Sequence, residues 1–275
     1  MNKLIIEVRE GLCNRLRVLI SASYLAERFS RELVLCWRPN HSCGARFRDL
    51  FTNPMTETDA LPEYPLPHKG SSRDVLARAI QSPEPVVCVS ECHWLVADKD
   101  QRKCVSHFIK LHPVNTVTQV VDEFAAKFCG HTVGVHVRRG DFAGQLSRNH
   151  NLKLPALGRY FSYLDKWRGT IFLATDGGEE VVEAFRDRYS DRLLIYSKHC
   201  PGRNTPQAVQ EALVDMYLLQ RCQAIIGTRY SSFSELAWCI TKTPHAKVSE
   251  REVGFLAKLK FSSRLILSHF HRSRH

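Results

Sequence analysis

The sequence predicts an α/β protein built on parallel β-sheets, and two patterns carry this prediction. Near the N-terminus, an apolar strand pattern at residues 4–8, a helical pattern at 16–29 and a second strand pattern at 33–37 form a βαβ opening. Beyond residue 131, strand and helix patterns alternate as far as residue 240. Such alternation is typical of doubly wound parallel sheets, because each helix returns the chain to the same edge of the sheet.

The chain has 275 residues, of which 44% are hydrophobic, and this length allows two modest domains. Residues 39–85 are rich in proline, glycine and polar side chains, so we expect irregular structure there with short helices at most. Residues 86–90 predict a third strand, and residues 114–128 predict a helix that leads into the next strand. We therefore expect an N-terminal domain of residues 1–112 and a C-terminal domain of residues 113–275.

The alternating patterns of the second domain define its expected elements. Strands are predicted at 132–137, 170–174, 193–196 and 224–227, and helices at 160–166, 181–189, 208–220 and 233–240. Open α/β sheets bind their ligands outside the carboxyl ends of the strands. The polar residues that follow these strands are therefore the first candidates for a functional site.

The first of these strands runs into a charged cluster that contains His136, Arg138, Arg139, Gly140 and Asp141. The rigid fork of donors on an arginine suits a diphosphate better than a flexible ammonium group does. A glycine lets the backbone approach a ligand closely. The cluster therefore predicts an anion site, although a buried strand with an exposed, salt-bridged turn would give the same pattern.

Two further strands also end in polar residues. Asp176 follows the strand near residue 174 and precedes two glycines. The strand near residue 227 leads through a hydroxyl-rich turn into a helix, which Ser231 or Ser232 would cap. Free N–H groups and the positive end of the helix dipole would then face an anion. Three strands are thus expected to place polar groups at one edge of the sheet.

In five segments, taken in order, the sequence resembles the fucosyltransferase superfamily that includes the α1,2, α1,6, nodulation and protein O-fucosyltransferase enzymes. The segments are 10–17 (EGLCNRLR), 136–141 (HVRRGD), 172–176 (FLATD), 213–219 (LVDMYLL) and 227–238 (GTRYSSFSELAW). The resemblance implies a GT-B-like fold, in which two Rossmann-like domains face a cleft, here with a reduced first domain. It also implies inverting transfer of L-fucose from GDP-fucose to a glycan or another hydroxyl acceptor, with no metal and no other cofactor.

The resemblance implies how the donor phosphates and sugar would be held. Arg138 would contact the β-phosphate as a catalytic residue. Ser231 and Ser232 would hold the same phosphates through the N-terminus of their helix. Asp141 and Asp176 would orient the ribose, the donor sugar or Arg138 itself, and Asp141 is also a catalytic candidate.

The resemblance also implies contacts with the nucleoside. His136 and Asp215 would border it, and Asp215 would accept hydrogen bonds from guanine. Further nucleotide-sugar contacts are expected from Gly11, Asn14, Arg15 and Phe233. The alternatives are a satisfied core histidine at 136 and a surface charge on a helix at 215. Arg139 could serve a structural salt bridge, because neighbouring residues of a strand point to opposite faces.

The expected general base is the point at which the sequence departs from the α1,6 branch. That branch carries a carboxylate a few residues beyond the position of Asp141, whereas residues 142–164 contain no Asp or Glu. Glu10 resembles the acid of one protein O-fucosyltransferase branch, and we expect it to be the base, with Asp141 and His150 as substitutes. The departure leaves the acceptor and the linkage open.

Two rival functions remain open from the sequence. A transferase that uses another nucleotide sugar could bind a divalent cation through Asp98-Lys99-Asp100, which has the spacing of an Asp-x-Asp metal site. A non-catalytic protein that binds a nucleotide sugar or a glycan would keep the phosphate site and lack the base. The missing carboxylate after Asp141 motivates this second alternative.

The net charge of +11, from 39 basic and 28 acidic residues, indicates polyanionic partners such as nucleotide phosphates, acidic glycans or anionic lipids. No nucleic-acid-binding motif accompanies the charge, so we expect no nucleic acid partner. Much of the excess lies in residues 251–275. That segment predicts either a peripheral membrane-surface helix or a final helix packed across the domains.

We expect a cytoplasmic protein, because the first residues are too soon interrupted by charge for a signal peptide and no apolar run approaches a membrane span. The ten cysteines are then expected to be reduced thiols rather than disulfides. Five potential ligands, Cys88, Cys92, His93, Cys104 and His107, lie close together in the sequence. Their spacing matches no standard zinc pattern, so no metal site is expected.

Overall fold

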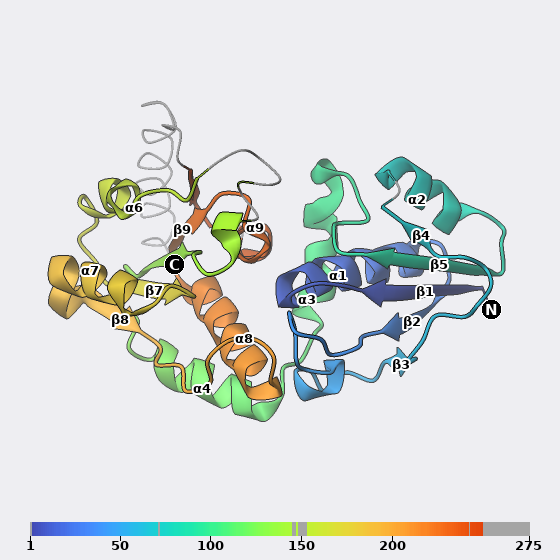
Figure 1. Ribbon diagram of the computed structural model, residues 1–275, viewed down its shortest axis with the longest axis horizontal. Helices are drawn as coiled ribbons and strands as arrows, with labels where there is room; N and C mark the ends of the chain where they lie inside the picture. The colour runs from blue at the N-terminus through green and yellow to red at the C-terminus, as the bar shows by residue number, and fades with distance from the viewer. Residues whose placement is uncertain (1, 71, 145–146, 148–152, 242, 250–275) are drawn as a thin grey trace, which may run out of the picture. The chain divides into compact units, whose positions relative to one another are not determined.

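The structure, a computed structural model, describes residues 2–70, 72–144, 147, 153–241 and 243–249 (Figure 1). The chain forms two compact units, Met1–Val120 with Lys198–Val214, and Val121–Ser197 with Asp215–His275. Two of the three points at which the chain changes unit lie inside helices α4 (Asn115–Ala125) and α8 (Pro206–Arg221). Compared with the division expected near residue 113, the first unit also includes residues 113–120 and 198–214.

The first unit is built on a five-stranded sheet with the order β3-β2-β1-β5-β4, in which all neighbours are parallel (Figure 1). Its strands are β1 (Lys3–Val8), β2 (Glu32–Cys36), β3 (Thr56–Glu57), β4 (His68–Lys69) and β5 (Val86–Glu91). The expected βαβ opening and third strand are confirmed. The two-residue strands β3 and β4 were not expected, because runs this short leave no alternation in the sequence.

The helices of the first unit pack on this sheet and follow the carboxyl ends of its strands, which we call the functional edge of the sheet. They are α1 (Leu12–Arg28), α2 (Arg73–Gln81), α3 (Val105–Ile109) and two 3-10 helices, η1 (Phe47–Asp49) and η2 (Asp98–Cys104). Helix α1 packs on β1 and β2 with Leu16 and Leu19 fully buried. Glu10 and Gly11 therefore connect the carboxyl end of the central strand to the start of α1, where α/β sheets bind ligands.

The second unit holds a parallel sheet with the order β10-β9-β6-β7-β8. Its strands are β6 (Val133–Val137), β7 (Ile171–Thr175), β8 (Leu193–Ile195), β9 (Ala224–Thr228) and β10 (His245–Val248). Strand β6 lies between β7 and β9, so the three strands end at one edge, as the sequence predicted. Strand β10 was not expected, because its four residues are too few for their polar and apolar alternation to be distinctive.

Two glycines allow helices to pack directly on this sheet. Within the described residues, this unit also contains α6 (Leu157–Leu164), α7 (Glu179–Tyr189), the 3-10 helix η3 (Ser190–Arg192) and α9 (Ser232–Thr241). A Cβ at Gly134 of β6 would lie 2.7 Å from Cδ2 of Leu219 in α8. A Cβ at Gly227 of β9 would lie 2.7 Å from Oγ of Ser234 in α9. The absence of these side chains brings α8 and α9 against the strands that end at the functional edge.

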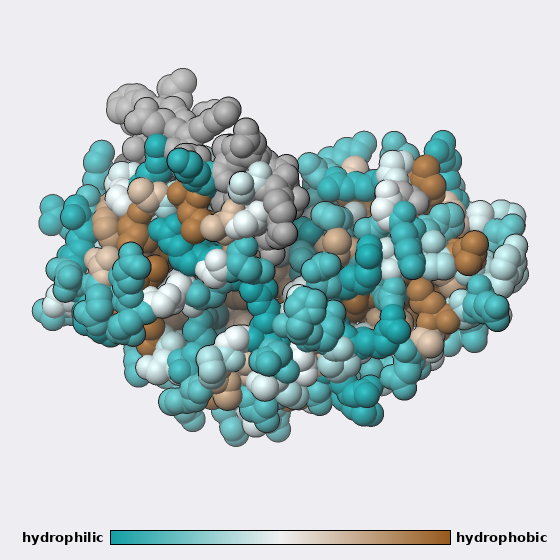
Figure 2. Space-filling model, in the orientation of Figure 1, coloured by the Kyte–Doolittle hydropathy of each residue, from teal (hydrophilic) through white to brown (hydrophobic). Residues whose placement is uncertain are grey.

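The surface shown in Figure 2 is largely hydrophilic in both units, with small separate hydrophobic areas. Among the described residues, none of the helices combines the length and the apolar character that crossing a membrane requires. All ten cysteines lie within the described residues and are free thiols, as expected. The basic segment 251–275 lies outside the described residues, so its contact with a membrane stays a prediction.

Candidate active site

The arginine that follows β6 is held between two carboxylates. Nη2 of Arg138 donates to Oδ1 of Asp141 at 2.7 Å, and its Nη1 forms an ion pair with Asp176. Asp141 belongs to the same loop, whereas Asp176 directly follows the neighbouring strand β7. Only 16% of the Arg138 side chain is exposed, and its guanidinium carbon lies 5.8 Å from the centre of the Phe142 ring. The structure therefore brings three expected site residues together and fixes the orientation of the arginine.

The adjacent arginine has different partners. Nη1 of Arg139 donates to the carbonyl oxygen of Pro155 at 2.9 Å, and its backbone N–H donates to Oδ1 of Asp176 at 2.6 Å. The side chain thus ties the loop after β6 to the segment that precedes α6. This geometry favours the structural role for Arg139 over a role at the ligand.

Gly140 has a backbone conformation that other residues rarely adopt, with φ at +41°. A Cβ at this position would lie 2.8 Å from Oδ2 of Asp176. Any side chain here would therefore push this carboxylate away from Arg138. The close approach that the glycine was expected to allow is made by the carboxylate of Asp176.

Helix α9 places its positive end at the same edge. It begins at Ser232, and the carbonyl oxygen of the buried Ser231 accepts a hydrogen bond from the N–H of Glu235 at 2.9 Å. Tyr230, just before it, turns the chain with φ at +64°. The first N–H groups of a helix have no partner inside it, so they are available to an anion. The helix starts where the sequence predicted, and contacts of the two serines with phosphate stay a prediction.

His136 is buried and has a defined partner. Its Nδ1 lies 2.7 Å from Oγ of Ser234, and its ring stacks on Phe233 with 4.6 Å between the ring centres. This favours the alternative of a satisfied core histidine, with Phe233 partly committed to the same stack. Sequence reasoning missed Ser234. The available signal was Gly227, because a glycine in a strand followed by a small residue in the next helix indicates close packing.

The two acidic residues of α8 are both buried. Asp215 is 4% exposed, so the alternative of a surface charge on a helix is wrong. Glu211, one turn earlier, was missed by sequence reasoning. Its two carboxylate oxygens accept the backbone N–H groups of His199 at 2.8 Å and Cys200 at 3.0 Å. Glu211 therefore fixes the chain that leads into α8.

In the first unit, the expected base has an unusual backbone conformation. Glu10 is exposed and has φ at +66°, whereas Gly11, at the N-cap of α1, has an ordinary φ of −73°. The strained backbone position of this loop is therefore occupied by Glu10 and not by Gly11. Non-glycine residues held in the left-handed region cost stability and occur most often at functional sites. The strain is consistent with a selected orientation of the Glu10 carboxylate.

The expected nucleotide contact of Arg15 is corrected by the structure. Its side chain has no exposed surface, so it cannot reach a ligand directly. Nε donates to the carbonyl of Glu10 at 2.8 Å and Nη1 to that of Arg38 at 2.7 Å, while the guanidinium lies over Trp37. Arg17 donates to the carbonyl of Cys92 at 2.8 Å. Both arginines thus hold backbone, and Arg15 positions the loop of the expected base.

Asn14 and His150 complete the expected set. Asn14 is half-buried in the first turn of α1, and its Oδ1 has no hydrogen-bond partner among the described residues. This oxygen is buried, so contact of Asn14 with a nucleotide sugar stays a prediction. His150, a substitute candidate for the base, lies outside the described residues.

A buried carboxylate on β1 was not expected from the sequence. Glu7 accepts a hydrogen bond from the Ser90 hydroxyl of β5 and pairs with Arg38, which follows β2. Burial alone would raise the pKa of Glu7, but these hydrogen bonds and the nearby charges of Arg38 and Lys69 outweigh it and lower the pKa. Glu7 is therefore ionised and links three strand ends beside the Glu10 loop.

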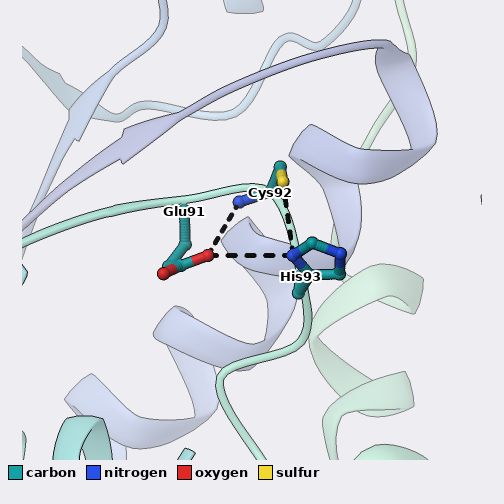
Figure 3. Close-up of side chains that lie close together, drawn as sticks. All are labelled: Glu91, Cys92 and His93. Atoms are coloured by element: carbon teal, nitrogen blue, oxygen red, sulfur yellow. Dashed lines mark hydrogen bonds and ion pairs between the residues drawn. The ribbon is translucent and has the colours of Figure 1, made fainter. Parts of the chain in front are cut away.

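Three potential metal ligands lie close together at the end of β5 and just after it, as Figure 3 shows. Oε2 of Glu91 lies 3.8 Å from Nδ1 of His93, which lies 3.3 Å from Sγ of Cys92. The Glu91 oxygens also accept backbone N–H groups, from Gly70 at 2.5 Å and from Cys92 at 3.3 Å. Burial raises the pKa of the Cys92 thiol, whereas a metal binds the thiolate. These contacts favour a cluster that fixes the loop, rather than a metal centre.

The Asp-x-Asp alternative fits the geometry less well. The two aspartates lie in the 3-10 helix η2, where Asp98 pairs with Arg73 at 2.5 Å and Asp100 with Lys103 at 2.6 Å. Hydrogen bonding by Lys103 lowers the pKa of Asp100. Each carboxylate already has a cationic partner, which favours an exposed charged turn.

The two parallel sheets, and the arginine held between two carboxylates at the end of β6, define a GT-B-like α/β protein. No protein-family model matches the sequence, and no curated protein matches it. Solved structures do match. The NodZ α-1,6-fucosyltransferase soaked with GDP-fucose is 20% identical with a TM-score of 0.62, over 89% of this chain and 94% of that chain. NodZ from Bradyrhizobium is 18% identical with a TM-score of 0.64, over 91% and 100% of the two chains.

POFUT1 in complex with GDP-fucose is 12% identical with a TM-score of 0.58, over 91% of this chain and 98% of that chain. A mutant of FUT1 from Arabidopsis thaliana in complex with GDP is 14% identical with a TM-score of 0.58, over 92% and 71%. These similarities extend over nearly the whole chain at low identity. The protein therefore has a fucosyltransferase-type fold.

Proposed function

We propose that the protein transfers L-fucose from GDP-fucose to a hydroxyl group of a glycan or another acceptor, with inversion at the anomeric carbon. The observation that carries the proposal is Arg138, oriented by Asp141 and Asp176 at the edge where α9 begins. Solved structures of this fold contain GDP-fucose or GDP. In this proposal the second unit binds the donor, and the first unit supplies the base and the acceptor side.

The leaving group explains why a fixed arginine matters. During transfer, the bond between the anomeric carbon and the β-phosphate oxygen breaks, and negative charge develops on GDP. Arg138 and the N-terminus of α9 would stabilise that charge without a metal ion. Because two carboxylates hold the guanidinium beforehand, little reorganisation is needed when the charge appears.

The acceptor requires a base on the other face of the sugar. Its oxygen forms a bond to the anomeric carbon while its proton passes to a carboxylate, for which we propose Glu10. Support comes from the exposure of Glu10, its place at the carboxyl end of β1 and its left-handed backbone. Arg15 would hold this loop in place through the Glu10 carbonyl.

The test combines binding and turnover with the full chain. Thermal shift with GDP, UDP and ADP should show clear selectivity for GDP. Incubation with GDP-fucose and a panel of hydroxyl acceptors should then release GDP and yield a fucosylated product. Stabilisation by UDP or ADP equal to that by GDP would contradict the proposed donor.

A second candidate is a binding protein without catalysis, favoured by the lack of any carboxylate in residues 142–164. It predicts tight and selective GDP binding with no turnover of GDP-fucose over a broad acceptor panel. Product formation with any acceptor excludes it.

A further inference from the structure

A single buried hydroxyl joins the ends of β6 and β9. Thr228, the last residue of β9, is 1% exposed. Its Oγ1 donates to the carbonyl of His136 at 3.0 Å and accepts the backbone N–H of Arg138 at 2.8 Å. The hydroxyl of Tyr160 lies 2.8 Å from the same oxygen. One side chain therefore contacts the backbone on both sides of Val137, immediately before the guanidinium that the proposed function uses.

The contacts of this hydroxyl use its full capacity. A hydroxyl has one donor and two acceptor positions. The Thr228 donor goes to His136, so Tyr160 must donate to it. Burial raises the pKa of Tyr160 to about 12, so its phenol is protonated and able to donate. Val at 228 would have nearly the same shape but would leave all three partners without this contact.

A second hydroxyl holds β6 from the opposite side. Thr175, the last residue of β7, donates through Oγ1 to the carbonyl of Val137 at 2.7 Å and accepts the N–H of Gly177 at 2.9 Å. Asp176, which lies between Thr175 and Gly177 in the sequence, pairs with Arg138. Consecutive carbonyls of β6 are thus bound by hydroxyls from its two neighbouring strands. The backbone at the start of the arginine loop is fixed from both sides.

We infer that Thr228, assisted by Thr175, is a positioning residue that sets the place of Arg138 relative to the donor phosphates. The inference rests on the proposed function. Neither threonine needs to touch the donor for this role. A displacement of a reacting group by about 1 Å can cost about a hundredfold in rate, so loss of the hydroxyl should act on turnover through Arg138.

The test is a set of substitutions on the full chain, with kcat, KM and GDP affinity measured for each. Thr228→Val should lower kcat by about 10- to 100-fold, and Thr228→Ser, which keeps the hydroxyl, should restore most of it. Thr175→Val should also lower kcat, and this variant provides the test if Thr228→Val does not fold. The matched control is Thr132→Val, because Thr132 is equally buried and its hydroxyl bonds Cys129 and Thr170 before the amino ends of the same strands.

A double-mutant cycle separates positioning from general destabilisation. If Thr228 acts through Arg138, Thr228→Val should weaken GDP binding in the wild-type background and have no further effect in Arg138→Ala. Equal losses in both backgrounds, or a loss in Thr132→Val as large as in Thr228→Val, would overturn the inference. Failure of the wild-type chain to bind GDP would instead overturn the proposed function itself, and this role with it.

Discussion

At the scale of single residues, the site depends on charges whose partners are already fixed. Arg138 has two carboxylate partners, Glu7 has a hydroxyl and a guanidinium, and Arg15 donates to two backbone carbonyls. The carboxylate partners of Arg138 are partly exposed, so its ion pairs set orientation more than stability, because exposed pairs contribute little net free energy. Substitutions at Arg138 should therefore separate function from folding.

Arg138→Ala should abolish transfer while leaving the fold intact. Charge-assisted hydrogen bonds contribute about 1.5 to 3 kcal/mol, so GDP affinity should fall by about 10- to 150-fold. Without the Arg138 guanidinium beside them, the carboxylates of Asp141 and Asp176 would then repel the diphosphate further. Titration calorimetry with GDP and a transfer assay measure both effects. Arg139→Ala is the control and should lose less GDP affinity and less transfer activity. A larger loss in that variant would assign the phosphate contact to Arg139 instead of Arg138.

Glu10→Gln should lower the transfer rate by about a hundred- to ten-thousandfold with little change in GDP affinity, because general-base catalysis contributes that range. Glu10→Gly should lose the same activity but gain about 1 kcal/mol or more of stability, since glycine adopts a positive φ without strain. Glu57→Gln, at an exposed carboxylate of β3, is the control. Near-normal transfer by Glu10→Gln would move the base to Asp141 or His150.

The low pKa of Glu7 predicts a pH-dependent stability. The folded pKa lies below the ordinary value of 4.5, so the ionised carboxylate stabilises the folded chain at higher pH. This contribution is lost as the pH falls through 4.5 and below the folded pKa. Denaturant unfolding at several pH values should show a shallower acid-side decline in Glu7→Gln than in the wild-type chain. Parallel declines would show that Glu7 is not stabilising.

At the scale of elements, the packing of α9 on β9 is the most restrictive contact. Gly227→Ala would place a Cβ 2.7 Å from Oγ of Ser234 and should destabilise the protein by about 1 to 3 kcal/mol. Gly158→Ala is the matched control, because a Cβ in this exposed part of α6 meets nothing within 4 Å. It should stabilise by about 0.5 to 1 kcal/mol. Chemical denaturation measures the free energy of unfolding of both variants. Changes of the same sign in Gly227→Ala and Gly158→Ala would contradict this argument.

Most elements could be predicted from the sequence because their apolar periods are long enough to be distinctive. The strand ends at Arg138, Asp176 and Ser231 were placed at one edge by topology alone. The contacts of the Thr228 hydroxyl and the burial of Asp215 were not predicted, since both depend on contacts between distant segments. Arg15 shows the opposite error, because a motif position predicts a ligand contact that its burial forbids.

At the scale of the whole molecule, the proposed chemistry needs no metal ion. Transfer should persist in excess chelator, because Arg138 and the N-terminus of α9 already supply positive potential at one edge. Cys92→Ser should be equally active, since Glu91 and His93 serve the loop in the structure. Loss of activity in chelator, with recovery on adding manganese, would contradict metal independence and return attention to Asp98 and Asp100.

The return of residues 198–214 to the first unit has a consequence for how the chain is made. The N–H of Gly44 donates to the carbonyl of Arg203 at 2.8 Å, and the side chain of Gln210 donates to the carbonyl of Asp49 at 2.7 Å. A ribosome that has released only the first 120 residues has not yet supplied these partners. The contacts of the first unit with residues 198–214 therefore form only after β6, β7 and β8 of the second unit have emerged, so the two units cannot mature independently.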